Sequence, residues 1–181
     1  MKPLFFIILF QVVTFVSGNN SLFILTEIPK YEKVSTIERE IPEEYRILVV
    51  NECTKYNIPL KIFIRHIYRE SRFKSNAIHY NYKIDPITNE KYIASIDQGI
   101  GQQNSLYHSE FVDLDNGGKE YDPMNPYQVI HVIAHHLCRM QQITNNWEIT
   151  IAGYNCGLTR ALTGDYPEVT KAHLAFVFGD A

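Results

Sequence analysis

The sequence has few cysteines, and their scarcity limits what can hold the protein together. Three are present in 181 residues, at Cys53, Cys138 and Cys156, so at most one internal disulfide can form and one thiol is left over. No pair has the spacing of a metal site. We expect Cys53 and Cys138 to be buried in the core, because an unpaired cysteine behaves as a small hydrophobic residue.

Compositional bias and internal repeats are also absent. Apolar residues make up 45% of the chain and charged residues 20%, which is typical of a globular protein and excludes a disordered or collagen-like chain. The length of 181 residues suits one domain with a sizeable core.

An excess of positive charge is absent as well. The formal net charge is −3, and without residues 1–18, which contain one charged residue, Lys2, it is about −4, from 16 basic and 20 acidic residues. A polyanion is a poor partner for such a chain. We therefore expect no interaction with nucleic acid.

The N-terminus lacks an apolar run long enough to be a stable transmembrane helix. The first 18 residues, MKPLFFIILFQVVTFVSG, contain an early lysine, a short apolar run interrupted by Gln11, and small residues at Ser17 and Gly18. This is the layout of a secretory signal peptide. We expect export to the periplasm or cell envelope with cleavage near Gly18. The alternative is an uncleaved N-terminus, which would then be the protein's one contact with the membrane.

Residues 40–181 are expected to form the main domain, after a leader at residues 19–39 that lacks steady periodicity. Apolar spacing and capping residues predict helices at about residues 42–56, 60–74, from Pro126 onward, 146–156 and 167–177. Residues 77–105 combine turn signals with an alternating segment, which predicts a long loop or a small β-hairpin. A long loop in a compact domain is usually functional.

Two groups of possible metal ligands have incomplete motifs. Asp113, Asp115 and Asp122 form an acidic cluster, but the twelve-residue calcium loop with its closing glutamate is missing. His131 and His135 have the spacing of a zinc pair on a helix, but the glutamate of the HExxH motif is missing too. We therefore expect no metal and no cofactor.

The stretch KIFIRHIYRESRF, residues 61–73, raises a question about one carboxylate. Helical spacing puts Glu70 on one face with four apolar residues: Phe63, Ile67, Phe73 and Ala77. One interpretation is a solvated surface residue, held by Lys74 one turn on. The other is a partly buried carboxyl, whose pKa is raised because desolvation disfavours the charged form. Such a group can act as a general acid near neutral pH.

Three short segments, taken in order, favour the second interpretation. They are ESRF at residues 70–73, SIDQGIGQQNS at residues 95–105 and WEITIAGYNCG at residues 147–157. Together they resemble the lytic transglycosylase domain of the lysozyme superfamily, whose motifs are ESxF, a glycine-rich GxxQ segment and AYNxG. The resemblance covers about residues 42–177. It implies a mainly α (α+β), lysozyme-like fold, with a small β-hairpin or loop insertion beside the catalytic helix.

The same resemblance implies an exported enzyme that cuts peptidoglycan between N-acetylmuramic acid and N-acetylglucosamine and forms a 1,6-anhydromuramyl product. Glu70 would be the acid and then the base. Tyr154 would aim its hydroxyl at Glu70, while Gln102 and Asn155 would bind the acetamido groups of the glycan. Ser71 would lie beside the cleaved sugar. Peptidoglycan strands are the expected partner, a secretion or motility machine is a candidate one, and the chain is expected to be a monomer.

The second segment is also similar to the loop of animal lysozymes that carries their second carboxylate, and Asp97 falls on that position. A hydrolytic muramidase using Glu70 and Asp97 is therefore an alternative. Specialised transglycosylases that accompany secretion systems can have an aspartate here too, so Asp97 leaves both reactions open. A third alternative is a cell-wall-binding protein that has lost turnover.

The sequence departs from the family pattern around the loop glutamine. Family members often have Leu-Met before it and an apolar residue after it, where this chain has Ile100, Gly101 and Gln103. The extra glycine and the amide predict a looser or more polar wall of the site.

An inserted hairpin at residues 80–92 is a further expectation from the spacing between Glu70 and Asp97. It carries three tyrosines, Tyr80, Tyr82 and Tyr92. They would either stack on sugar rings or pack the hairpin itself, and the sequence favours neither.

Overall fold

The computed structural model describes residues 41–108 and 121–179. The predicted signal peptide and leader lie outside the described residues, as do Asp113 and Asp115 of the acidic cluster. No helix within the described ranges is both long and apolar enough to span a membrane.

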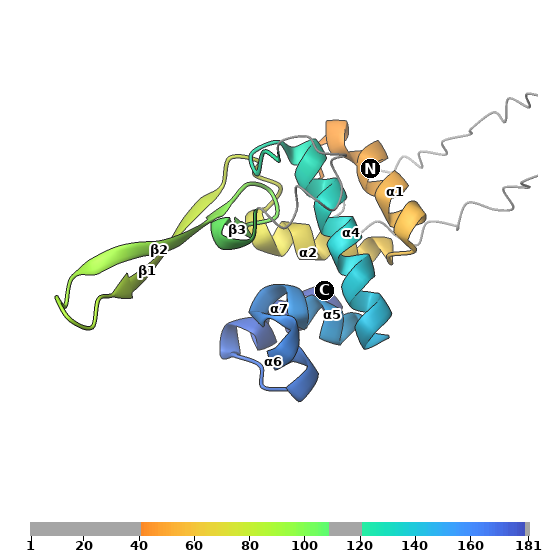
Figure 1. Cartoon of the computed structure of the whole chain (residues 1–181). Helices are drawn as coiled ribbons and strands as arrows, with labels where there is room; N and C mark the ends of the chain where they lie inside the picture. Colours follow the sequence, from red (N-terminus) through yellow and green to blue (C-terminus); the bar gives the residue numbers. More distant parts are fainter. Residues whose placement is uncertain (1–40, 109–120, 180–181) are drawn as a thin grey trace, which may run out of the picture. The chain divides into compact units, whose positions relative to one another are not determined.

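Within these ranges, helices surround a shared apolar core, and a small sheet leaves the helices on one side (Figure 1). In chain order the elements are α1 (Glu43–Tyr56), α2 (Leu60–Ser71), β1 (Ile78–Ile84), β2 (Lys91–Gln98), β3 (Gln103–Asn104), the 3₁₀ helix η2 (Ser105–Tyr107), α4 (Pro126–Thr144), α5 (Trp147–Cys156), α6 (Leu158–Thr163) and α7 (Glu168–Phe178). The predicted class, mainly helical with a small hairpin, is confirmed. The six-residue α6 was not predicted from the sequence. A helix this short has no apolar stripe that a sequence pattern could show.

The core is built around α4, which packs against α1 and α5. Asn125 caps the helix, since its side chain accepts a hydrogen bond from the Tyr127 backbone N–H at 3.1 Å, and Pro126 is the first helical residue as predicted. The apolar face of α4 is fully buried at Ile130, Ile133 and Leu137, all 0% exposed. Each such side chain contributes about 1.5–3 kcal/mol by leaving water.

The helix that carries Glu70 ends earlier than predicted. α2 stops at Ser71, because Arg72 and Phe73 both adopt left-handed backbone conformations, with φ of 54° and 61°. Phe73 is still buried, at 6% exposed, but it reaches the core from a turn rather than from the helix. Ala77 and Lys74 likewise lie beyond the helix, so the interpretation in which Lys74 holds Glu70 from one helical turn on does not apply.

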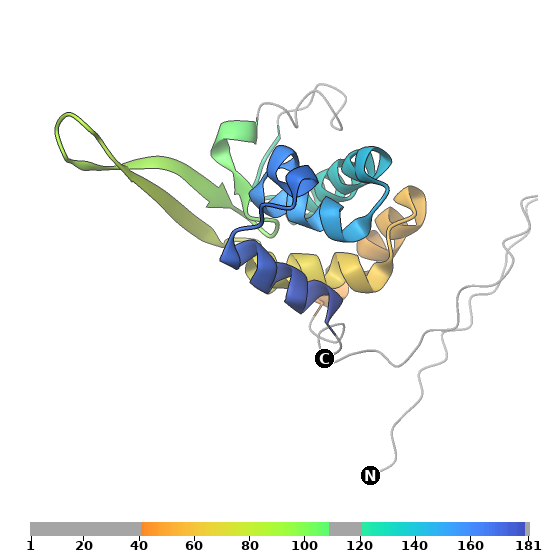
Figure 2. The same ribbon diagram turned by 90° about the horizontal axis from the view of Figure 1, so that it is seen from below.

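α7 lies along α2 (Figure 2), and a buried arginine helps to join them. The Arg65 guanidinium, 1% exposed, donates to the backbone carbonyls of Val177 and Gly179 at the end of α7. Those carbonyls have no partner within a helix. The long-range bonds from α2 therefore complete the hydrogen bonding of the last helix.

The sheet is antiparallel, in the order β1-β2-β3. The turn between β1 and β2 forms because the Asp85 carboxylate accepts from the backbone N–H groups of Ile87 and Thr88, at 2.7 and 3.0 Å. The hairpin tyrosines are about half exposed: Tyr80 at 44%, Tyr82 at 51% and Tyr92 at 48%. Lys91 Nζ lies 4.0 Å from the centroid of the Tyr82 ring, and the ring centroids of Tyr80 and Tyr82 are 6.5 Å apart, so these two tyrosines pack within the hairpin while keeping exposed surface.

The three cysteines are unpaired in the structure. Cys53 is buried in the core at 4% exposed, as predicted. Cys138 is only half-buried, so its predicted core position is wrong. It lies on α4 outside the face that carries Ile133 and Leu137.

Candidate active site

Glu70 lies in the last turn of α2 with its side chain only 13% exposed. Its Oε1 atom is buried and has no hydrogen-bond partner among the described residues. Burial, the largest cause, and the negative charge of Asp97 together raise the pKa of Glu70 to about 8, against the lowering effect of Arg69. A solvated surface glutamate is therefore excluded, and this carboxyl holds its proton at neutral pH.

Two histidines that the sequence analysis did not single out as site residues face Glu70. His66 Nδ1 and His173 Nε2 share a hydrogen bond of 3.1 Å. The Nδ1 atoms of His66 and His173 lie 3.9 and 3.8 Å from Glu70 Oε1. Burial lowers the pKa of His66 well below its ordinary value and that of His173 to about 4. The pair is therefore neutral at pH 7 and does not draw the proton from Glu70.

The two histidines differ in how far the sequence could have revealed them. His66 precedes Glu70 by one helical turn, a spacing visible in the sequence. His173 is on α7, far along the chain, and reaches the site through the packing of α7 on α2. No local pattern points to it.

Tyr154, from α5, approaches the same cluster. The edge of its ring packs against His66, with centroids 4.5 Å apart. Its hydroxyl donates to the Gly101 carbonyl at 3.1 Å. Burial raises the pKa of Tyr154 well above its ordinary value, and the nearby Glu70 raises it further. The phenol therefore keeps its proton and lies close to Glu70, although its hydrogen bond is to the loop.

Asp97, on β2, is held by two amide side chains. Asn81 donates to one carboxylate oxygen at 2.8 Å and Asn104 donates to the other at 2.7 Å. Both amides also donate to the hydroxyl of Ser95, at 3.2 and 2.8 Å. These bonds fix the carboxylate on the sheet, and its charge acts on Glu70.

Ser71 and Gln102 bind the backbone of the glycine-rich loop. The Ser71 hydroxyl, on a residue 8% exposed, donates to the Ile100 carbonyl at 2.7 Å. The Gln102 amide donates to the carbonyls of Ala77 and Gly99 at 3.2 and 3.0 Å. Both side chains fix the loop that passes over the end of α2.

Gln103, the residue after the predicted amide ligand, is buried at 3% exposed. Neither atom of its side-chain amide has a hydrogen-bond partner among the described residues. The Gln103 side chain lies near the Tyr154 hydroxyl, where it opposes the rise in the tyrosine pKa. Gln103 is therefore a buried polar group beside Tyr154, and a polar wall facing the substrate stays a prediction.

One of the two expectations was that Gly101 would make this wall looser. The structure shows the opposite. A Cβ atom at this position would lie 2.5 Å from the Ile133 Cδ1 atom and 3.1 Å from a Val129 methyl. The glycine therefore allows the loop to press directly on α4. Tight packing is the reason for its presence.

Asn155 follows Tyr154 on α5. Its side-chain oxygen accepts a hydrogen bond of 2.6 Å from the Thr170 hydroxyl on α7. Asn155 therefore links the helix of Tyr154 to the helix of His173.

A metal ion could be held at one place in the described ranges. His66, Glu70 and His173 each offer a ligand atom, and these atoms lie within 4.8 Å of one another. The zinc-like pair on α4 is arranged differently, since the His131 ring nitrogen lies 2.9 Å from a Glu52 carboxylate oxygen. The His135 ring instead packs near the ring of Tyr56, with centroids 5.7 Å apart.

The fold and this cluster define a helical domain with a buried glutamate beside a glycine-rich loop. Residues 48–165 match the family described as the transglycosylase SLT domain, and the chain belongs to that family. The resemblance found in the three motifs is thereby confirmed.

Among solved structures, the chain is similar to an inactive glutamate-to-glutamine mutant of lytic transglycosylase Slt from Pseudomonas aeruginosa. The TM-score is 0.56 at 16% sequence identity, and the match covers 75% of this chain and 23% of that one. The likeness confirms the lysozyme-like fold. This chain corresponds to less than a quarter of that protein's length. A search of curated proteins finds no match.

Proposed function

We propose that the protein is an exported peptidoglycan lytic transglycosylase. It cleaves the β-1,4 bond between N-acetylmuramic acid and N-acetylglucosamine and leaves a 1,6-anhydromuramyl end. The observation that carries the proposal is Glu70, a carboxyl 13% exposed whose buried oxygen has no partner among the described residues. The carboxyl holds its proton at neutral pH because its pKa is about 8, and family membership supplies the class of reaction.

In the first step, protonated Glu70 donates its proton to the glycosidic oxygen as the bond to C1 of the muramyl sugar breaks. The leaving sugar departs as an alcohol, and positive charge develops on the muramyl ring. A pKa of about 8 keeps the acid protonated at neutral pH. The neutral His66 and His173 pair supports this state, because it adds no positive charge near the carboxyl.

In the second step, the Glu70 carboxylate accepts the proton of the C6 hydroxyl of the same sugar. The C6 oxygen attacks C1 and closes the anhydro ring, so Glu70 recovers its proton and no water is consumed. An attack within one molecule benefits from a high effective concentration. No metal or cofactor takes part in either step.

The remaining residues bind or position the glycan. Asn155 and Gln102 supply amides to the acetamido groups of the glycan, Gln102 through its side-chain oxygen, because its amide nitrogen is bound to backbone carbonyls. Ser71 and Gln102 hold the loop at the cleaved sugar. Tyr154 keeps this loop and His66 in place beside Glu70.

A hydrolytic muramidase is the second candidate, and one observation favours it. Two amides hold the Asp97 carboxylate in place, and its negative charge acts on Glu70. A fixed carboxylate near the acid suits a nucleophile or charge stabiliser. This reaction predicts a loss of at least about 100-fold in Asp97→Asn. A transglycosylase in which Asp97 only tunes Glu70 predicts a much smaller loss.

The cellular setting is part of the same proposal. The chain acts in the periplasm or cell envelope on glycan strands, as a monomer, and a secretion or motility machine is the candidate that would direct the cut. Nucleic acid is not a partner.

The proposal is tested by Glu70→Gln, which keeps the size of the side chain and removes its proton. Turnover of purified peptidoglycan is expected to fall by at least about 1,000-fold, while the thermal unfolding midpoint changes little. Glu168→Gln, on an exposed glutamate that pairs with Lys171, is the matched control and retains full activity. A fully active Glu70→Gln protein would overturn the assignment.

A further inference from the structure

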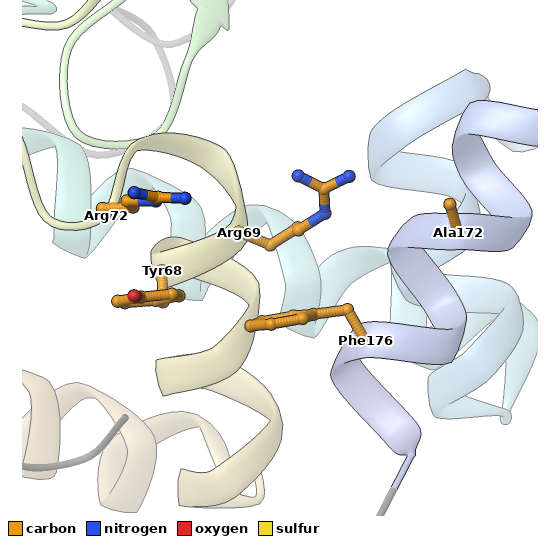
Figure 3. Close-up of a pocket in the computed structure, with 5 residues that line it drawn as sticks. All are labelled: Tyr68, Arg69, Arg72, Ala172 and Phe176. Atoms are coloured by element: carbon orange, nitrogen blue, oxygen red, sulfur yellow. The ribbon is translucent and has the colours of Figure 1, made fainter. Parts of the chain in front are cut away.

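A cavity lies between α2 and α7, at the end of α2 that carries Glu70. It has a volume of about 210 Å³ and is lined by five residues: Tyr68, Arg69, Arg72, Ala172 and Phe176 (Figure 3). None of these five has a role in the reaction described above. The cavity is small for a whole ligand but large enough for one charged group and a short side chain.

Two arginines supply the charge of this cavity. The guanidinium groups of Arg69 and Arg72 make no ion pair or hydrogen bond with any residue in the described ranges. Elsewhere in these ranges, Arg46 pairs with Glu43 and Arg160 pairs with Asp165. Within the described ranges, the two arginines are thus positive charges without an ion-pair partner, in a chain whose net charge is negative.

Aromatic rings form the apolar side of the cavity. Tyr68 and Phe176 are stacked with centroids 5.9 Å apart and only 9° between their planes. In Figure 3 both arginine side chains lie on the same side of these rings. A ligand with a carboxylate beside a hydrocarbon part matches this arrangement, because guanidinium binds carboxylate through two parallel hydrogen bonds and the rings cover apolar surface.

The cavity lies next to the catalytic acid. Arg69 is adjacent to Glu70 in α2, and its charge acts on both Glu70 and His173. In the proposed reaction the cleaved bond belongs to a muramyl sugar, and that sugar carries the peptide stem of peptidoglycan. A peptide carboxylate is therefore present close to each bond that the enzyme would cut in a strand that still carries its peptides.

We propose that this cavity binds a carboxylate of the peptide stem, so that the enzyme prefers glycan strands that still carry their peptides. The inference rests on the proposed function for its substrate, and it assigns the specificity to Arg69 and Arg72. Arg72 makes the sharper probe, because Arg69 also acts on the pKa of Glu70.

A purely structural role for Arg72 makes a different prediction. Arg72 is the C-cap residue of α2, where a positive charge interacts favourably with the helix dipole. If this were its whole role, Arg72→Gln would lower the stability of the protein and would affect all substrates equally.

The test compares two substrates: peptide-bearing glycan strands, and the same strands after an amidase has removed the peptides. The wild-type kcat/KM is expected to be about tenfold higher for the peptide-bearing strands. Arg72→Gln is expected to lose most of this preference by slowing cleavage of the peptide-bearing strands alone. Arg160→Gln, on an exposed and paired arginine, keeps the preference. Equal wild-type rates, or equal losses on both substrates in Arg72→Gln, would overturn the proposal.

A binding measurement separates this proposal from the proposed function. A soluble muramyl peptide, and the same compound with its carboxylates amidated, are titrated calorimetrically into Glu70→Gln and into Glu70→Gln with Arg72→Gln. Selective binding of the free carboxylate form to the first protein, weakened about tenfold in the second, supports the cavity even if neither strand is cleaved. Equal binding of both forms contradicts it.

Discussion

The Glu70 side chain is mostly buried, and its Oε1 atom has no hydrogen-bond partner among the described residues. These two features together determine the chemistry of the site. Several groups face its carboxyl: the neutral His66 and His173, Asp97 on the sheet, Arg69 on its own helix and Tyr154 on α5. The largest influence is burial, which favours the protonated form. In the proposed reaction, the ionisation of this one residue governs the dependence of activity on pH.

The first prediction concerns that dependence. Glu70 must hold its proton to act as the acid, so kcat/KM is expected to be constant around pH 7 and to fall tenfold per pH unit well above the pKa of about 8. The measurement is a pH–rate profile on soluble glycan fragments. An unchanged rate at high pH, in protein that is still folded, would contradict the assignment of Glu70 as the acid.

Substitution of His173 probes the cause of the raised pKa. His173→Asn is expected to admit water beside Glu70, which weakens the effect of burial and moves the descending limb of the profile to lower pH. His131→Asn is the matched control, since His131 pairs with Glu52 instead, and it leaves the limb in place. Identical limbs in the wild type and His173→Asn would show that the histidine pair does not shield the acid.

The residues of the site differed in how well the sequence predicted them. The burial of Glu70 was one of two interpretations of its helix, which the three motifs favoured over a solvated surface position, and Ser71 and Tyr154 follow from the motifs. His173 was not, because its place depends on how α7 packs on α2. Gln103 was read as a departure from the family pattern, and only the structure shows its amide buried and unpaired among the described residues.

At the scale of elements, the glycine-rich loop is held by contacts with three helices. Ser71 binds it from α2, Tyr154 binds it from α5, and Gly101 lets it lie against α4. The loop is therefore a rigid part of the site. Its sequence suggested greater freedom, because a glycine that permits close packing looks the same in a sequence as one that permits a turn.

The second prediction compares two glycines. Gly101→Ala places a methyl 2.5 Å from Ile133 Cδ1 and is expected to lower the free energy of unfolding by about 1–3 kcal/mol. Gly153→Ala, in α5, meets Leu158 and Met140 at 3.4 Å and gains helix propensity, so it is expected to be neutral or to stabilise by up to about 1 kcal/mol. Urea unfolding measures both variants. Equal effects would mean that the loop is not packed tightly on α4.

The helix boundaries were predicted well where a capping residue marks them. Asn125 and Pro126 begin α4 as expected. The end of α2 was missed by three residues because Arg72 and Phe73 adopt left-handed conformations, which neither residue type signals. This early end is important, since it turns the chain from the helix of Glu70 into the hairpin of Asp97.

At the scale of the described domain, the candidate active site is assembled from segments far apart in the chain. Glu70 comes from α2, Asp97 from the sheet, Tyr154 from α5 and His173 from α7. Helical class and motif order were predictable from the sequence, because they depend on local spacing. The pairing of α2 with α7 was not, although it brings His173 to the acid and forms the arginine cavity.

The third prediction concerns that pairing. Arg65→Ala removes the guanidinium that binds the Val177 and Gly179 carbonyls from α2, and it leaves those groups without their partner in a buried place. The free energy of unfolding is expected to fall by about 3 kcal/mol or more. Arg46→Ala, on an exposed residue paired with Glu43, is the control, with a change below about 1 kcal/mol. Similar effects of the two substitutions in urea unfolding would show that Arg65 does not secure α7.

The most direct test of the central claim is mass spectrometry of the fragments that the protein releases from purified peptidoglycan. A lytic transglycosylase that uses Glu70 as acid and base releases 1,6-anhydromuramyl ends, each lighter by one water than the hydrolysed form. We expect these ends from the wild type and none from Glu70→Gln. Ordinary reducing ends would contradict this account and would make the protein a hydrolase in which Asp97 takes part in the reaction.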